Sequence, residues 1–503
     1  MIERIAQIKD VASLEQFVQN EYDNIYHYFI FQSYKDIQSN KKEIEYLLSN
    51  SYALIRELDL SNTINKNFLT VVILATERIG AFSLFERYYG LIKDANDIPL
   101  RLQAVSKYRI GIKRFDDYER IFDDFLSTLS LAYELEEDNI EVVLAVFIEY
   151  YARVIKNFGQ FNQAAILNFK RKIENTDTYL LKLPIIQEVL EVDIQDFRQA
   201  YEQIQVILDE LLNRVYHIPS LKETCFLIED PESIYVKKLT LAQRDFNSIR
   251  RISTNIWKTI NDSNIYHSLG RGVCVLTEEN QLYAYFNSYG PVHYTKMVSA
   301  LGTIDFSSLT KDIEVIDWGC GQGLASITLL EQYPKLPIYS VTLIEPSEIA
   351  LKRASLHVKH MKNSLEIRTV CKPFDSLTCD DIATDLGKIK IHLFSNILDV
   401  ELFSLTNLQN LISRTQKGLN YFICASPYIN ELKTERIGLF RKYFERNYNS
   451  FSPIGIDYTT SKNGNEYWNC NKNFRGEKCP DHPQCGCDNK WTRVIRVFKV
   501  NFN

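Results

Sequence analysis

A glycine-rich turn between an expected strand and an expected helix constrains this 503-residue chain more than any other feature. The stretch IEVIDWGCGQGLASITLL, residues 313–330, runs from a β-branched segment through Gly319, Gly321 and Gly323 into an apolar helical pattern. Alternate glycines let the backbone turn sharply and come close to a ligand, because no Cβ atom stands in the way. The turn therefore predicts a strand–helix unit that holds a ligand at the carboxyl end of its strand.

The sequence after about residue 310 alternates short β-branched runs with helical segments. Strands are predicted at IEVIDW, IYSVTLIEP, LEIRTVC, KIKIHLFSN, LNYFICAS and WTRVIRVFKVNF, with helices between most of them. Such alternation is typical of a doubly wound α/β fold, in which a parallel sheet carries helices on both faces. Ligands bind these sheets beyond the carboxyl ends of the strands.

Residues 1 to about 250 contain few Gly and Pro, and their apolar residues recur at three- and four-residue steps. The pieces GAFSLF, KRFDDY and GQFNQA each begin the second of two predicted helices, which is typical of helical hairpins such as tetratricopeptide repeats. Their uneven spacing of 33 and then 46 residues leaves two alternatives open, an irregular helical domain and a solenoid with a binding groove. We predict an all-α, helical-hairpin domain over residues 1–255 and an α/β domain over residues 256–503.

The turn reads D-x-G-x-G-x-G, because Asp317 stands two residues before the first glycine. DWGCGQG resembles motif I of the class I S-adenosylmethionine-dependent methyltransferases, and the resemblance covers about residues 280–503. Three further features follow in that family's order, namely Glu345 after the second strand, CKPFDSL after the third and HLFSNILDV at the fourth. The resemblance implies a doubly wound methyltransferase sheet, methyl transfer activity and S-adenosylmethionine as cofactor.

The resemblance also assigns parts of a cofactor site. Glu345 would accept hydrogen bonds from the ribose hydroxyls, and Asp317 would organise the turn and contact the methionine portion. Phe374 would stack beside adenine, and Asp375 would accept from its amino group. The residues assigned to the cofactor are Asp317, Gly319, Cys320, Gly321, Gly323, Glu345, Pro346, Phe374, Asp375 and Asn396.

The candidate catalytic residues come from two segments. Asn396 would face the methyl group and the acceptor, but SNIL lacks the proline pair and the aromatic residue that the family uses on adenine amines and glutamine amides. Residues 285–297, just before the sheet, offer Tyr289 and His293, and this histidine is either a general base or a packed residue. Cys424 is expected to be a strand thiol rather than a nucleophile.

Four cysteines crowd an expected insertion at residues 468–491. Cys470, Cys479, Cys485 and Cys487 follow the spacing C-x8-C-x5-C-x-C, and four thiolates suit a tetrahedral zinc ion. An iron–sulfur cluster could use the same ligands, and a reduced loop or a disulfide pair is the alternative without a metal.

The distribution of charge and the composition of single segments limit which classes of partner and compartment are expected. Residues 411–503 hold 15 Lys and Arg against 8 Asp and Glu, a net charge of +7. Because the whole chain has a net charge of −6, the remaining residues carry a net charge of −13. A basic end is compatible with RNA, with docking to the acidic helical domain, or with a solvated face. The N-terminus does not resemble a secretory signal and no window reaches the length of a membrane span, so a cytoplasmic protein without a membrane partner is expected.

These features together predict methyl transfer from S-adenosylmethionine to a macromolecular acceptor, with RNA or a protein of the translation machinery favoured. The alternative is a cofactor-binding or catalytically inactive interaction protein whose helical domain recruits a protein partner.

Overall fold

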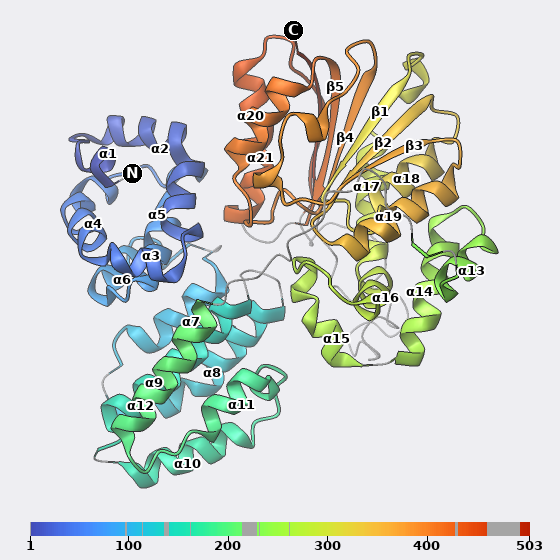
Figure 1. The fold of residues 1–503 in the computed structure, drawn as a ribbon. Helices are drawn as coiled ribbons and strands as arrows, with labels where there is room; N and C mark the ends of the chain where they lie inside the picture. Colours follow the sequence, from blue (N-terminus) through green and yellow to red (C-terminus); the bar gives the residue numbers. More distant parts are fainter. Residues whose placement is uncertain are drawn as a thin grey trace. The chain divides into compact units, whose positions relative to one another are not determined.

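The computed structural model of the protein describes residues 2–502 apart from 96–97, 113, 135–139, 161, 214–228, 231, 261, 428–430 and 460–492. The internal contacts of the chain divide it into two compact units (Figure 1). The helical unit is Met1–Tyr216 with Ile429–Glu431, and the sheet unit is His217–Tyr428 with Leu432–Asn503.

The helical unit consists of amphipathic helices around an aromatic core. Phe125 and Tyr150 stack with ring centroids 4.4 Å apart, and the Tyr150 hydroxyl donates to the carbonyl of Tyr118. The helices are α1 (Ile2–Ala6), α2 (Val11–Tyr26), α3 (Tyr34–Ser39), α4 (Lys41–Ile55), α5 (Thr63–Arg78), α6 (Phe82–Tyr89), α7 (Leu100–Arg109), α8 (Phe115–Glu134), α9 (Ile140–Phe158), α10 (Gln163–Glu174), α11 (Pro184–Glu191) and α12 (Phe197–Leu212).

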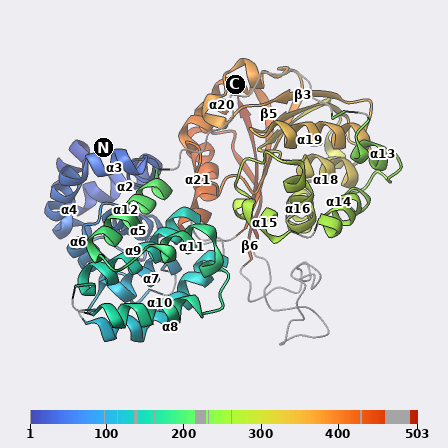
Figure 2. The ribbon, with the colours of Figure 1, turned by 60° about the horizontal axis from the view of Figure 1, so that its bottom comes forward.

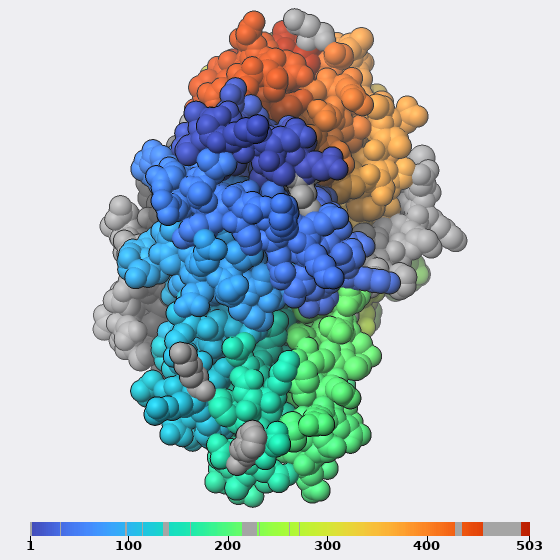
Figure 3. Space-filling view, turned by 90° about the vertical axis from the view of Figure 1, so that its left-hand side faces the viewer, coloured from blue at the N-terminus to red at the C-terminus, as the bar shows by residue number. Residues whose placement is uncertain are grey.

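Helical hairpins are confirmed in this unit. Phe82 begins α6 and Phe115 begins α8, and these helices pack against α5 and α7 respectively. The third piece contains Phe161, which lies outside the described residues, and α10 begins just after it. The helices follow one another through the unit in chain order (Figure 1), and the colours on its surface run from blue to green (Figure 3). Helix α12 packs back against α9. Nowhere in the described residues is a helix both long enough and apolar enough to cross a membrane.

The sheet unit contains a seven-stranded sheet in the order β3-β2-β1-β4-β5-β7-β6. The first five strands in that order are parallel, and β7 pairs antiparallel with both β5 and β6. This strand order, with helices on both faces, confirms the doubly wound α/β fold expected from the sequence. The strands are β1 (Ile313–Trp318), β2 (Ile338–Ile344), β3 (Glu366–Val370), β4 (Ile389–Ser395), β5 (Gly418–Ser426), β6 (Ser452–Thr459) and β7 (Arg493–Phe502).

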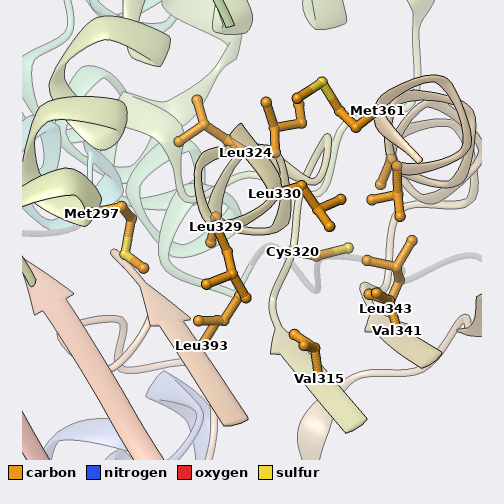
Figure 4. Packing of buried hydrophobic residues seen from close by; sticks show 14 of the residues in the cluster. Met297, Val315, Cys320, Leu324, Leu329, Leu330, Val341, Leu343, Met361 and Leu393 are labelled. Carbon is orange, nitrogen blue, oxygen red and sulfur yellow. The ribbon is translucent and has the colours of Figure 1, made fainter. Parts of the chain in front are cut away.

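Helices cover both faces of this sheet (Figure 2). On one face, Met297 and Leu329 point from helices α17 and α18 toward Val315 and Leu393 of the central strands (Figure 4). On the other face, aromatic side chains such as Phe422 and Phe498 stack beneath α21. The helices are α13 (Ile234–Thr240), α14 (Phe246–Ile260), α15 (Ser263–Ser268), α16 (Glu279–Ser288), α17 (Gly290–Leu301), α18 (Leu324–Gln332), α19 (Glu348–Met361), α20 (Leu405–Thr415) and α21 (Glu431–Asn447).

The boundary between the units falls after Tyr216, whereas the sequence placed it near residue 255. Tyr235 and Phe246, from α13 and α14, are buried in the main core of the sheet unit. Arg353 of α19 donates to Glu229 over 2.9 Å, and its guanidinium lies 3.5 Å from the centroid of the Tyr235 ring. The local pattern of these helices resembles that of the helical unit, so only their long-range contacts reveal where they belong.

This packing predicts that a fragment of residues 217–503 unfolds in one cooperative transition. A fragment of residues 256–503 should be less stable by at least about 3 kcal/mol, because it lacks two large aromatic side chains of the core. Urea denaturation followed by circular dichroism measures the difference. Equal unfolding free energies for the two fragments would show that α13 and α14 are not part of this core.

Candidate active site

The glycine turn joins the end of β1 to the start of α18, and all three of its glycines have positive φ. A Cβ atom on Gly319 would lie 2.7 Å from Ile397, and one on Gly323 would lie 3.2 Å from Ala354. A Cβ atom on Gly321 would meet no atom of the described residues within 4 Å. Two glycines therefore allow close packing of the protein, and Gly321 leaves its surroundings open for a ligand.

Asp317 is the last but one residue of β1, and its side chain is only 1% exposed. One carboxylate oxygen, Oδ2, accepts from the backbone N–H and the hydroxyl of Ser326, at 3.1 and 2.7 Å. The other oxygen, Oδ1, is buried and has no hydrogen-bond partner among the described residues. Burial raises the pKa of Asp317 to about 6, although the bonds from Ser326 oppose the shift.

Glu345 follows β2 directly and lies beside the glycine turn. Its Oε2 accepts from the N–H of Gly321 and its Oε1 from the N–H of Ser347, each at 3.0 Å. Burial raises the pKa of Glu345 to about 7, against the effect of these two bonds, and the nearby Asp317 carboxylate raises it further. The resemblance assigned this residue to a ribose, and its carboxylate lies next to the open surroundings of Gly321.

The turn is also held by residues that the sequence did not indicate. The Gln322 side chain donates to the carbonyl of Leu282 in α16 over 2.9 Å, and its own backbone carbonyl lies 2.8 Å from Nδ1 of His357. Nε2 of His357 lies 2.7 Å from the Tyr235 hydroxyl. Burial lowers the pKa of His357 to about 3, so its imidazole is neutral and connects the turn to α13. These partners are far apart in sequence, so no local pattern could have identified them.

Asn396 lies just beyond the end of β4, the strand beside β1. Its φ of 56° is positive, which no other non-glycine residue shares in the described chain. Its side-chain Oδ1 accepts from the ammonium of Lys296 over 2.7 Å, and its Nδ2 donates to the hydroxyl of Ser395 over 3.0 Å. The neighbouring Ile397 packs against Gly319, so Asn396 lies next to the glycine turn.

His293 lies on helix α17 together with Lys296, and Tyr289 is the residue between α16 and α17. The His293 ring centroid is 6.1 Å from that of Tyr289, and Tyr289 stacks nearly parallel to Tyr266. Burial lowers the pKa of His293 well below its usual value, and the positive charge of Lys296 lowers it further. The imidazole is therefore neutral, and the same surroundings disfavour its protonated form, which makes it a weak base.

Phe374 and Asp375 lie after β3, as the sequence predicted, but both have protein partners. Phe374 is 8% exposed and packs its ring against Trp318 and Phe403. The Asp375 carboxylate accepts from the N–H of Ser404 at the start of α20, over 3.1 Å, and from the side chain of Asn407. Their assignment to adenine stays a prediction.

The thiols near the sheet are protonated. Burial raises the pKa of Cys320 in the turn and of Cys424 in β5 well above the usual range. The carbonyl of Pro346 accepts a hydrogen bond from the thiol of Cys371 over 3.8 Å. Cys424 is fully buried, in agreement with a strand thiol rather than a nucleophile.

The predicted metal ligands lie outside the described residues. Cys470, Cys479, Cys485 and Cys487 fall within residues 460–492. Within the described ranges, no group of three or more His, Cys, Asp or Glu side chains is arranged to hold a metal ion.

The polar groups at the carboxyl ends of β1 and β2 fit a nucleoside cofactor with an amino-acid tail. Asp317 Oδ1, which has no partner among the described residues, can accept from an ammonium group, the Glu345 carboxylate can accept from hydroxyls, and the space beside Gly321 is open.

No family model matches the sequence, and no curated protein does. Among solved structures, the chain is similar to the plantazolicin methyltransferase BpumL in complex with a desmethylPZN analog and SAH, at 12% identity and a TM-score of 0.27, covering 54% of this chain and 100% of that one. It is similar to the small RNA methyltransferase HEN1 at 14% identity and a TM-score of 0.26, covering 41% and 25% of the two chains. It is similar to StiE O-MT at 15% identity and a TM-score of 0.27, covering 40% and 72%. Likeness at this level says nothing about the acceptor.

The raised pKa of Glu345 predicts that affinity for S-adenosylhomocysteine falls as the pH falls below about 7, by up to about tenfold per unit. The ribose hydroxyls would donate to the ionised carboxylate. Below the pKa, Glu345 has to lose a proton before it can bind them, and the free energy of this deprotonation lowers the affinity. Isothermal titration calorimetry between about pH 5.5 and about pH 8 measures this, because the ligand itself does not titrate in that range.

The control is Glu345→Gln, which stays neutral at every pH. In that variant the loss of affinity should begin only below about pH 6, where Asp317 takes up a proton. A wild-type affinity that is constant over the whole range would contradict the role of both carboxylates.

Proposed function

We propose that the sheet unit binds S-adenosylmethionine at the glycine turn and that the protein transfers the methyl group to a macromolecular acceptor. The observation that supports this most is the buried Oδ1 of Asp317, for which the described part of the chain supplies no hydrogen-bond partner. An unpaired carboxylate oxygen in the interior is costly, and a ligand ammonium would satisfy it. When bound, the cofactor supplies a methyl group already activated by its sulfonium, and the protein has to align the acceptor and exclude water.

The chain's own residues would divide the work as follows. Asp317 receives the methionine ammonium, and Glu345 receives the ribose hydroxyls. Asn396 lies at the end of the neighbouring strand, where its amide orients the acceptor. Where the acceptor has to lose a proton, His293 would take it up against the effects of burial and Lys296 that lower its pKa, and Tyr289 lies beside it at the end of α16.

The charge of the two units favours different partners for each. Residues 1–216 carry 24 Lys and Arg against 34 Asp and Glu, a net charge of −10, whereas residues 217–503 carry 34 against 30, a net charge of +4. A negatively charged helical unit is a poor surface for phosphates, so it suits a protein partner. RNA and a protein of the translation machinery are the two acceptors that the sequence favours, and we expect the protein in the cytoplasm.

One observation favours a second function. Both ends of the Asn396 amide already have protein partners, Lys296 and Ser395, which would suit a chain that binds the cofactor without transferring its methyl group. The helical unit would then recruit a partner to a cofactor sensor. Zinc at the four late cysteines stays a prediction from the sequence.

The proposal predicts that Gly321→Val weakens binding of S-adenosylhomocysteine by more than about tenfold. The new side chain would fill the space that is open beside Gly321, and it would strain the positive φ of this residue. The matched control is Gly111→Val, because Gly111 has a φ of +77° and equally open surroundings but lies in the helical unit. Calorimetry that finds equal affinity in Gly321→Val and wild type would refute the proposed site.

A separate prediction concerns Asn396→Ala. This variant should keep cofactor affinity within about twofold of wild type and lose about tenfold or more of its methyl transfer rate, since its side chain orients the acceptor. Transfer of tritiated methyl into a fractionated lysate from cells that lack the protein provides the assay. Binding without any transfer by the wild type would favour the sensor function instead.

A further inference from the structure

The peptide group between Gln322 and Gly323 belongs to the glycine turn and is held at both of its polar ends. Its N–H donates to the carbonyl of Cys320 over 2.7 Å, and its carbonyl lies 2.8 Å from Nδ1 of His357. Gln322 is 2% exposed and His357 is fully buried, so the bond between them is shielded from water. A buried carbonyl needs such a donor, and here His357 on helix α19 supplies it.

This peptide group is the part of the turn that most needs a partner. Gln322 stands between Gly321 and Gly323, whose φ angles are 52° and 78°, and glycine adopts positive and negative φ about equally readily. Without a hydrogen bond at its carbonyl, the group can rotate at little steric cost. Rotation would disturb the neighbouring N–H of Gly321, which donates to the Glu345 carboxylate. His357 therefore holds the turn in one conformation before any ligand arrives.

The ring of His357 connects this peptide group to helix α13. A carbonyl oxygen only accepts hydrogen bonds, so Nδ1 of His357 carries the hydrogen and Nε2 keeps the lone pair. The Tyr235 hydroxyl, 2.7 Å from Nε2, is therefore the donor to the ring. Burial lowers the pKa of His357 to about 3, and the charge of Arg353 lowers it further, so the ring stays neutral in this arrangement.

Tyr235 is itself held in place by a buried cation. The guanidinium of Arg353 lies 3.5 Å from the centroid of the Tyr235 ring, and it donates to the Glu229 carboxylate over 2.9 Å. Both Tyr235 and Arg353 are buried. The contacts from Arg353 through His357 to Gln322 thus form one buried polar network, and such networks hold their members in a single arrangement.

We propose that His357 is a positioning residue that sets the affinity of the cofactor site through the Gln322 carbonyl, and that Tyr235 fixes its ring. The proposal rests on the proposed function, because the ligands concerned are S-adenosylmethionine and its product at the glycine turn. The physical reason is preorganisation. A turn that already has its binding conformation loses less conformational freedom when the ligand binds, so the ligand binds more tightly.

Two substitutions separate the two hydrogen bonds of the ring. The amide nitrogen in His357→Asn falls near the place of Nδ1 and can still donate to the Gln322 carbonyl, whereas the longer amide in His357→Gln falls near the place of Nε2 and keeps only the Tyr235 contact. Each variant loses one buried hydrogen bond, so both should be less stable than wild type. His357→Gln should bind S-adenosylhomocysteine about tenfold more weakly, and His357→Asn should stay within about threefold of wild type.

Tyr235→Phe tests the outer part of the network in a variant that keeps the aromatic ring and its packing. Affinity should fall by about threefold, since His357 then lacks the donor that orients it. The matched control is Tyr88→Phe, because Tyr88 is also fully buried and its hydroxyl donates to the carbonyl of Leu48 over 2.6 Å in the helical unit. Equal affinities in these two variants would contradict the part assigned to Tyr235.

Calorimetry on the full chain measures the affinities, and urea denaturation measures the stabilities. Equal losses of affinity in the two His357 variants would overturn the proposal, because affinity would then follow stability rather than the bond to Gln322. Hydrogen–deuterium exchange of the ligand-free protein needs no cofactor, and the amides of Gly321 and Gly323 should exchange about tenfold faster in His357→Gln than in His357→Asn. Equal exchange there would also overturn the proposal. Failure of the wild type to bind S-adenosylhomocysteine would refute the proposed function, even where the exchange rates differ as expected.

Discussion

The two hydrogen bonds from Ser326 to Asp317 join the end of β1 to the start of α18, and the rest of the site depends on them. One carboxylate oxygen accepts both bonds, and the other is buried without a hydrogen-bond partner in the ranges that the structure describes. Between the joined ends, Gly319, Gly321 and Gly323 complete the connection with positive φ. The turn is therefore closely packed where it meets Ile397 and Ala354 and open beside Gly321, where a ligand is expected.

Elements outside the sheet complete this arrangement from the helical face. A backbone carbonyl of helix α16 accepts a hydrogen bond from the Gln322 side chain. The His357 ring contacts the Gln322 carbonyl with one nitrogen and the Tyr235 hydroxyl of α13 with the other. Helix α17 brings Lys296 to Asn396. Residues of α13, α16 and α17, well before the first strand, therefore contribute both to the shape of the turn and to the charge at the end of β4.

The sequence predicted what depends on local patterns. The strands and helices were predictable from residue periodicity, and the glycine turn and Glu345 were predictable from the need for glycine and an acid at such a turn. The sequence predicts a domain boundary near residue 255, whereas the internal contacts divide the chain after Tyr216, because α13 and α14 have the same amphipathic pattern as the helical unit. The contacts of Lys296 and His357 join residues far apart in sequence, and no local pattern encodes them. The resemblance assigns Asp375 to adenine, which stays a prediction, and the capping of α20 by its carboxylate is a contact that no local pattern indicated.

The measurement that tests the central account most directly is hydrogen–deuterium exchange with and without S-adenosylhomocysteine. If the glycine turn holds the cofactor, the amides of residues 319–323 and the segment around Glu345 should exchange more slowly when the ligand is present, while the turn at Gly111 in the helical unit should not change. Protection elsewhere, with no change at residues 319–323, would contradict the account.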